Sequence, residues 1–166
     1  MNTSKTNQKI RWTILFYMTA LIVSGVTAIP VKLEMEWLLR HMPLPQVAIN
    51  IFEEVLIAVT ETDGKYPFLL YGYDWLAFAH IVIAIAFWGV YKDPVRNKWL
   101  VDFGLIACVL IIPFAIVAGE MRSIPFWWRL VDCSFGVFGA LPLLYIRALI
   151  RRIEVVSGEE KLNLLF

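Results

Sequence analysis

Three residues of the chain are candidates for acid–base chemistry: His80, Glu120 and Asp132. They combine a titratable side chain with a position within or beside a long apolar stretch of the sequence. An imidazole titrates near neutral pH and a carboxyl group can give or take a proton, so a dry pocket joining them could move protons on a substrate. Trp75 and Trp128 stand near them in the sequence, and aromatic faces stabilise positive charge. His80, Asp132 and Glu120 are therefore the catalytic candidates of an enzyme acting on a lipid-like or isoprenoid substrate.

Asp132 needs a partner if it lies in a membrane. An ionised Asp at mid-bilayer costs roughly 2.5–3.5 kcal/mol on insertion scales, and less near the interface. Helical spacing offers Arg129 one turn before it, Arg122 from the preceding helix and His80 from another helix. Pairing with an arginine predicts a structural clasp that fixes helix register, whereas contact with His80 predicts a proton-transfer site. The sequence leaves both open.

The binding candidates are Arg122, Arg129, Trp75, Trp128 and Asp74. The tryptophans also fit the aromatic belts that anchor helices at membrane interfaces. Asp74 is most simply a cap or first-turn acid where a membrane helix begins, since a carboxylate is favourable at a helix N-terminus.

Metal and cofactor sites are not expected. The chain has two histidines, His41 and His80, and no His-Glu-x-x-His sequence, Gly-rich phosphate loop, nucleophile elbow or Cys-x-x-Cys pair. Cys108 and Cys133 fall at depths that differ by roughly 12 Å along their helices. Because a disulfide needs closer Cα atoms, we expect free thiols and predict no metal and no cofactor.

The elements that would position these residues are membrane helices. The chain of 166 residues is 60% hydrophobic and 17% charged, against about 25% charged in a soluble domain. Residues 12–31, 75–91 and 103–119 carry no charge and are near the ~17–25 residues that cross a bilayer. A fourth run, 130–145, reaches that length only if it includes Asp132. We predict an all-α, polytopic integral membrane protein: one membrane domain over residues 1–166, a four-transmembrane-helix bundle with spans near 12–31, 74–91, 99–119 and 128–146 and a tail over 147–166.

The long loop between the first two spans should contain an amphipathic helix over about residues 46–61. Apolar residues recur there at helical spacing, with Gln46, Asn50, Glu53 and Glu54 on the other side. Asp63-Gly64 is a turn signal that would end it, and residues 33–41 would form a short interfacial turn.

Basic residues indicate the orientation. They gather before the first span, after the second and after the fourth, where Arg147, Arg151 and Arg152 would anchor anionic headgroups. The positive-inside rule then places both termini in the cytoplasm of a multi-pass protein of the cell membrane, most simply the bacterial cytoplasmic membrane. We expect the first span to be an uncleaved helix; the alternative is a signal peptide cut after Ala28.

Small residues predict which helix faces are buried, because membrane helices approach closely where side chains are small. One face of the fourth span carries Asp132, Gly136 and Gly139, and one face of the third carries Gly104 and Cys108. The second span likewise has one face that carries Ala77, His80 and Ala84. His80 and Asp132 should therefore point away from lipid.

These patterns define three functional hypotheses. A net charge of +1 without a basic face argues against nucleic acid as a partner. The leading hypothesis is a non-catalytic accessory or ligand-binding bundle with an outward polar cluster, whose partners are membrane lipid, a hydrophobic or amphipathic ligand, and a membrane protein or a second copy of the chain. The alternative is the acid–base enzyme, and a third hypothesis is a small ion- or proton-coupled transporter, since intramembrane acids and histidines serve proton relays.

Overall fold

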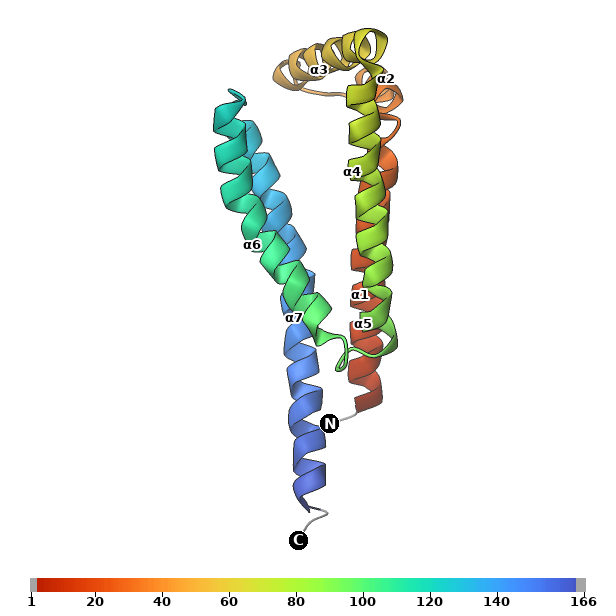
Figure 1. Ribbon diagram of the computed structural model, residues 1–166, viewed down its shortest axis with the longest axis vertical. Helices are drawn as coiled ribbons and strands as arrows, with labels where there is room; N and C mark the ends of the chain where they lie inside the picture. Colours follow the sequence, from red (N-terminus) through yellow and green to blue (C-terminus); the bar gives the residue numbers. More distant parts are fainter. Residues whose placement is uncertain (1–2, 164–166) are drawn as a thin grey trace. The chain divides into compact units, whose positions relative to one another are not determined.

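The computed structural model describes residues 3–163, and within them every regular element is a helix (Figure 1). The helices are α1 (Thr3–Ala28), α2 (Val31–His41), α3 (Gln46–Lys65), α4 (Pro67–Ala86), α5 (Trp88–Lys92), α6 (Lys98–Met121) and α7 (Phe126–Asn163). Four segments are long and apolar enough to cross a membrane: Ser4–Ala28, Pro67–Lys92, Lys98–Met121 and Phe126–Gly158. The prediction of an all-helical chain with four span-length helices is confirmed.

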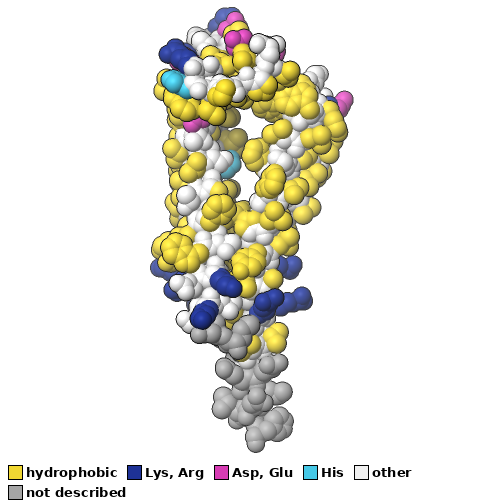
Figure 2. All heavy atoms as spheres, turned by 180° about the vertical axis from the view of Figure 1, so that it is seen from behind, with side chains coloured by type: hydrophobic (Ala, Val, Ile, Leu, Met, Phe, Trp, Pro, Cys, Tyr) yellow, Lys and Arg dark blue, Asp and Glu magenta, His cyan; other side chains and the backbone are white. Residues whose placement is uncertain are grey.

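The long helices expose large apolar side chains rather than burying them. Phe16, Phe114 and Phe138 are 70%, 71% and 68% exposed on α1, α6 and α7. Figure 2 shows hydrophobic side chains along these helices, with Lys and Arg concentrated towards one of their ends. Contiguous apolar surface of this extent is unusual in soluble monomers and is suited to contact with lipid.

The chain divides into two compact units. The first consists of α1 up to Met18 and the chain from Ala86 onward, which includes α5, α6 and α7. The edge of the Tyr17 ring packs on Phe87, with ring centroids 5.1 Å apart. Its fully buried side chains come from all four helices and the residue before α5: Ile10, Ile14, Phe87, Val90, Val101, Leu143, Ile146 and Ile150.

In this unit α6 and α7 pack through small residues. A Cβ atom on Gly136 would lie 2.5 Å from the backbone oxygen of Cys108, and one on Gly139 would lie 3.2 Å from the Cys108 sulfur. One turn further along α7, Leu143 fills the space beside Gly104, where a Cβ would lie 2.7 Å from its Cδ1. For this helix pair, the glycine spacing correctly predicts which faces meet.

The second unit is Thr19–Ile85, which holds the rest of α1, α2, α3 and nearly all of α4. Gly25 of α1 packs on α4, where a Cβ atom would lie 2.7 Å from the backbone oxygen of Ala77 and 3.1 Å from the Cβ of His80. Ala77 and Ala84 are buried. The small residues of α4 therefore face α1 at this position.

Two details of the predicted loop are wrong. The helix α3 continues through Asp63-Gly64 to Lys65, and the Tyr66 N–H still donates to the Thr62 carbonyl oxygen at 2.7 Å. It ends where Pro67 begins α4, since proline disfavours helical backbone in the residue before it. The preceding segment is a complete helix, α2, rather than a short turn.

The predicted tail over residues 147–166 begins inside α7, which continues to Asn163. Residues 164–166 lie outside the described part of the chain, as do residues 1 and 2.

Candidate functional site

Four charged candidates lie in or beside the turn between α6 and α7, and we call them the turn cluster: Glu120, Arg122, Arg129 and Asp132. The turn is shaped by backbone bonds. The helix α6 ends at Met121 with Arg122 as its cap, and Ser123 takes a left-handed conformation with φ of 56°. The N–H of Ser123 donates to the Glu120 carbonyl oxygen and that of Ile124 to the Gly119 carbonyl oxygen, at 3.1 and 2.9 Å. This is the Schellman pattern of a helix end, with serine where glycine is usual.

Arg129 joins α7 to this turn. Its Nε–H donates to the backbone oxygen of Ile124 at 2.9 Å, and its Nη1 forms a short, charge-assisted bond to Glu120 Oε2. The methylene groups of Arg129 lie against Gly119, where a Cβ atom would come within 2.6 Å of Arg129 Cγ. The guanidinium also lies 5.7 Å from the centre of the Phe126 ring. Arg129 thus has a buried stem and three neighbours of its own unit around its head.

The partners of Arg129 differ in exposure. The Arg129 side chain is 13% exposed, whereas that of Glu120 is 73% exposed. Arg122 is exposed at the cap position, and no described residue forms an ion pair or side-chain hydrogen bond with it. Arg129 is therefore the largely buried member of the ion pair, and Glu120 is its solvent-exposed partner.

Asp132 lies one turn after Arg129 on α7 and is half-buried. Of the partners expected for it, Arg129 pairs with Glu120 instead, and Arg122 makes no ion pair among the described residues. No hydrogen bond or ion pair to Asp132 occurs within the described part of its unit. The ion pair at this turn thus joins Arg129 to Glu120, and the predicted pairing of Asp132 with an arginine does not occur among the described residues.

His80 belongs to α4 in the second unit. Its Nδ1 lies 2.9 Å from the backbone oxygen of Leu76, one turn earlier. A carbonyl oxygen can only accept, so Nδ1 carries the proton and Nε2 is the ring nitrogen left for another partner. Its Cβ packs beside Gly25, and the residue is half-buried.

The aromatic candidates make contacts with other rings. Trp75 is 56% exposed and meets Tyr71 and Phe78 edge-on, with centroids 6.0 and 5.8 Å apart. Trp128 is half-buried and meets Trp127 edge-on at 5.3 Å. Such geometry suits both interfacial anchoring and an apolar wall for a ligand.

The cap predicted at Asp74 is wrong. The helix α4 begins at Pro67, and its first turn contains no acidic residue. Proline fits the first position of a helix because its fixed φ and missing N–H cost nothing there. Asp74 consequently lies in the second turn of α4, half-buried, where its carboxylate faces no free N–H groups of a helix end.

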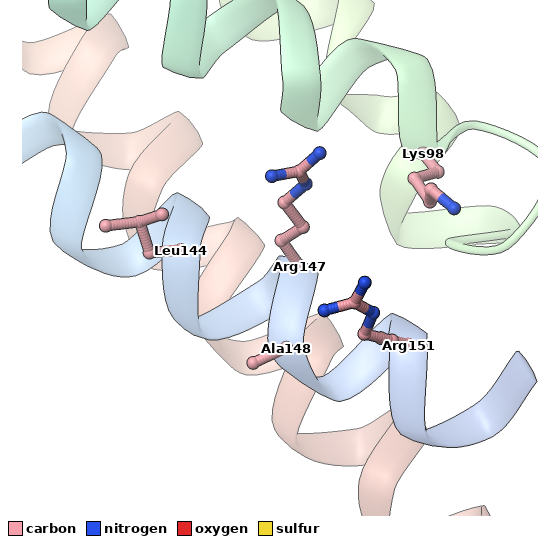
Figure 3. A pocket seen from close by; sticks show the side chains of 5 residues that line it. All are labelled: Lys98, Leu144, Arg147, Ala148 and Arg151. Atoms are coloured by element: carbon pink, nitrogen blue, oxygen red, sulfur yellow. The ribbon is translucent and has the colours of Figure 1, made fainter. Parts of the chain in front are cut away.

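A second polar group lies in the first unit, where α6 begins. Lys98 Nζ donates to both carboxylate oxygens of Glu154, at 3.0 and 3.1 Å, and Arg147 Nε lies 2.7 Å from Asp102 Oδ1. Between the helices a pocket of about 270 Å³ is lined by Lys98, Leu144, Arg147, Ala148 and Arg151 (Figure 3). The sequence predicts headgroup anchors at these arginines but does not predict the pocket. The available signal was the four-residue spacing of Arg147 and Arg151, which places them on one helix face.

Among the described residues no group of three His, Cys, Asp or Glu side chains is arranged to hold a metal ion. Cys108 and Cys133 are free thiols, both half-buried.

The chain matches no protein-family model, no curated protein and no solved structure.

Proposed function

We propose that this chain is a non-catalytic, multi-pass membrane protein that serves as an accessory or ligand-binding subunit, and that Arg129, together with Glu120, stabilises the α6–α7 hairpin. The observation that carries the proposal is the commitment of Arg129 to the hairpin itself. Its Nε–H bonds the Ile124 carbonyl, its Nη1 bonds Glu120, and its stem covers Gly119. A group held on several sides is suited to fixing the geometry of the turn.

The membrane assignment is supported by the four span-length apolar helices and by their exposed aromatic and aliphatic side chains. Lys98, Arg147, Arg151 and Arg152 all belong to one end of the α6–α7 pair, and the turn cluster belongs to the other. The positive-inside rule then favours the cell membrane with both termini on the cytoplasmic side, so that the turn cluster faces outward.

The test compares folding with function in cells that lack the native gene. The non-catalytic proposal expects Arg129→Gln to lower the amount of folded protein in the membrane and to leave cellular function per folded molecule unchanged. Arg122→Gln is the matched control, because it removes a nearby exposed arginine that has no ion pair among the described residues. Normal accumulation of Arg129→Gln with complete loss of function would overturn the proposal.

A second candidate function, a membrane-embedded enzyme using acid–base chemistry on a lipid-like or isoprenoid substrate, is favoured by Asp132. Its carboxyl group is half-buried in α7 and lacks a hydrogen bond or ion pair within the described residues of its unit. An intramembrane acid without a structural partner is a candidate for proton transfer. Trp128, one turn earlier on α7, would supply an aromatic wall.

Asp132→Asn tests this second candidate. Asn keeps the size of the side chain but cannot act as a general base at neutral pH. The enzyme proposal expects a folded protein that has lost its cellular function. A folded Asp132→Asn protein with full function would remove Asp132 from any mechanism.

A further inference from the structure

The pocket between α6 and α7 presents three cations from two helices. Arg147 and Arg151 are one turn apart on α7, and Lys98 is the first residue of α6. Figure 3 shows both guanidinium groups projecting from α7 to the side on which Lys98 lies. Like charges at this spacing on one helix repel each other, so an anion between them would be stabilising.

Two carboxylates near the pocket, Asp102 and Glu154, leave N–H donors of Arg147 and Arg151 without a partner among the described residues. Asp102 contacts Arg147 through Nε, and Glu154 engages the Lys98 ammonium. No described residue is hydrogen-bonded to the Nη atoms of Arg147 or to the guanidinium of Arg151. Two planar guanidinium groups with free N–H donors match the oxygens of a phosphate, which arginine binds through paired hydrogen bonds.

The remaining walls of the pocket are apolar. Ala148 lies between the arginines in sequence, and Leu144, 50% exposed, lies one turn nearer to the apolar part of α7. A ligand whose phosphate sits at Arg151 can therefore extend along Leu144 on to the exposed apolar surface of α7. A charged region followed by an apolar one matches the structure of a phospholipid, in which a phosphate is joined through glycerol to acyl chains.

We infer that the pocket formed by Lys98, Leu144, Arg147, Ala148 and Arg151 is a binding site for the phosphate of an anionic phospholipid. Basic pockets between membrane helices bind lipid headgroups in this way. The site lies at the other end of the α6–α7 pair from the turn cluster, beside the first residue of α6, so its occupancy does not depend on the role of that cluster.

Arg151 is the residue to change, because its removal breaks no ion pair within the described chain. Native mass spectrometry of the purified full-length protein, titrated with phosphatidylglycerol, should show a first bound lipid whose affinity falls about fivefold in Arg151→Gln, the change expected for one basic residue near an anionic headgroup. Arg152→Gln removes the same charge from the neighbouring exposed residue, which does not line the pocket, and should change the affinity less than twofold.

Two measurements on the unmodified protein complete the test. Phosphatidylglycerol should bind more tightly than phosphatidylcholine, and inorganic phosphate at millimolar concentration should not displace it. Equal losses in Arg151→Gln and Arg152→Gln would reduce the effect to general surface charge and overturn the site. Equal binding of the two lipids would overturn its preference for anionic lipid, and displacement by inorganic phosphate would assign the pocket to a soluble phosphate instead.

Discussion

Replacing Arg129 with Gln should cost far more stability than replacing its partner Glu120. The Arg129 Nε–H bonds a backbone carbonyl at 2.9 Å from a side chain that is only 13% exposed. A hydrogen bond from a charged group in such a position contributes about 1.5–3 kcal/mol. The ion pair to Glu120 adds at most about 1 kcal/mol, because that carboxylate is 73% exposed and well solvated. We therefore expect Arg129→Gln to lower the free energy of unfolding by about 2–4 kcal/mol and Glu120→Gln by about 1 kcal/mol or less.

The measurement is reversible unfolding of the purified protein in mixed micelles with increasing sodium dodecyl sulfate, followed by near-ultraviolet circular dichroism of the tryptophans. Arg122→Gln is the control at the same turn, and it should change the free energy of unfolding by less than about 0.5 kcal/mol, as expected for an exposed surface substitution. Lys in place of Arg129 keeps the charge but lacks the Nε–H, so Arg129→Lys should resemble Arg129→Gln more than the unmodified protein.

Equal stability of Arg129→Gln and Arg122→Gln would contradict this expectation, since the turn would then form without the guanidinium. A second contradicting result would be that Glu120→Gln and Arg129→Gln lower the free energy of unfolding by the same amount. The ion pair alone would then account for the effect, and the bond to the Ile124 carbonyl would contribute nothing.

Three further substitutions probe the first unit. Gly136→Ala should destabilise the protein by about 1–3 kcal/mol, because the new Cβ would lie 2.5 Å from the Cys108 backbone oxygen; Gly158→Ala on the same helix meets nothing within 4 Å and should not destabilise. Equal stabilities in thermal unfolding would contradict the close packing of α6 on α7. Ser123→Gly should stabilise the turn by about 1 kcal/mol, because serine pays for its φ of 56° and glycine does not; a loss of stability would show that the turn has another conformation. Glu154→Gln should lower the free energy of unfolding by at most about 1 kcal/mol, because it removes the half-exposed ion pair with Lys98. A loss of stability that persisted in 1 M salt would contradict the assignment to an ion pair that salt screens.

The sequence predicts the helices better than the contacts between charges. Apolar runs without charge indicate the four span-length helices, because length and hydropathy alone determine whether a helix can cross a bilayer. The spacing of Gly136 and Gly139 indicates the face of α7 that meets α6, since only small residues allow such an approach. These are local properties of one helix at a time.

Boundaries and charge pairing depend on more than one segment. The start of α4 at Pro67 differs from the start predicted near residue 74, because residues 67–73 are helical although they precede the charge-free run that begins at residue 75. Arg129 and Glu120 are nine residues apart, and a helical repeat gives no reason to pair them. The left-handed Ser123 turns the chain so that they meet. The pocket lined by Lys98 and Arg147 likewise depends on two helices, so the spacing of residues within one helix does not predict it.

The most direct measurement of the turn is the Nε–H proton of Arg129 in a ¹H–¹⁵N nuclear magnetic resonance spectrum of the protein in micelles. A guanidinium Nε–H that donates to the Ile124 carbonyl should exchange slowly with water at neutral pH, and its signal should vanish in Arg129→Gln and persist in Arg122→Gln. An Arg129 Nε–H that exchanges as fast as those of exposed arginines would contradict the claim that this residue holds the α6–α7 hairpin together.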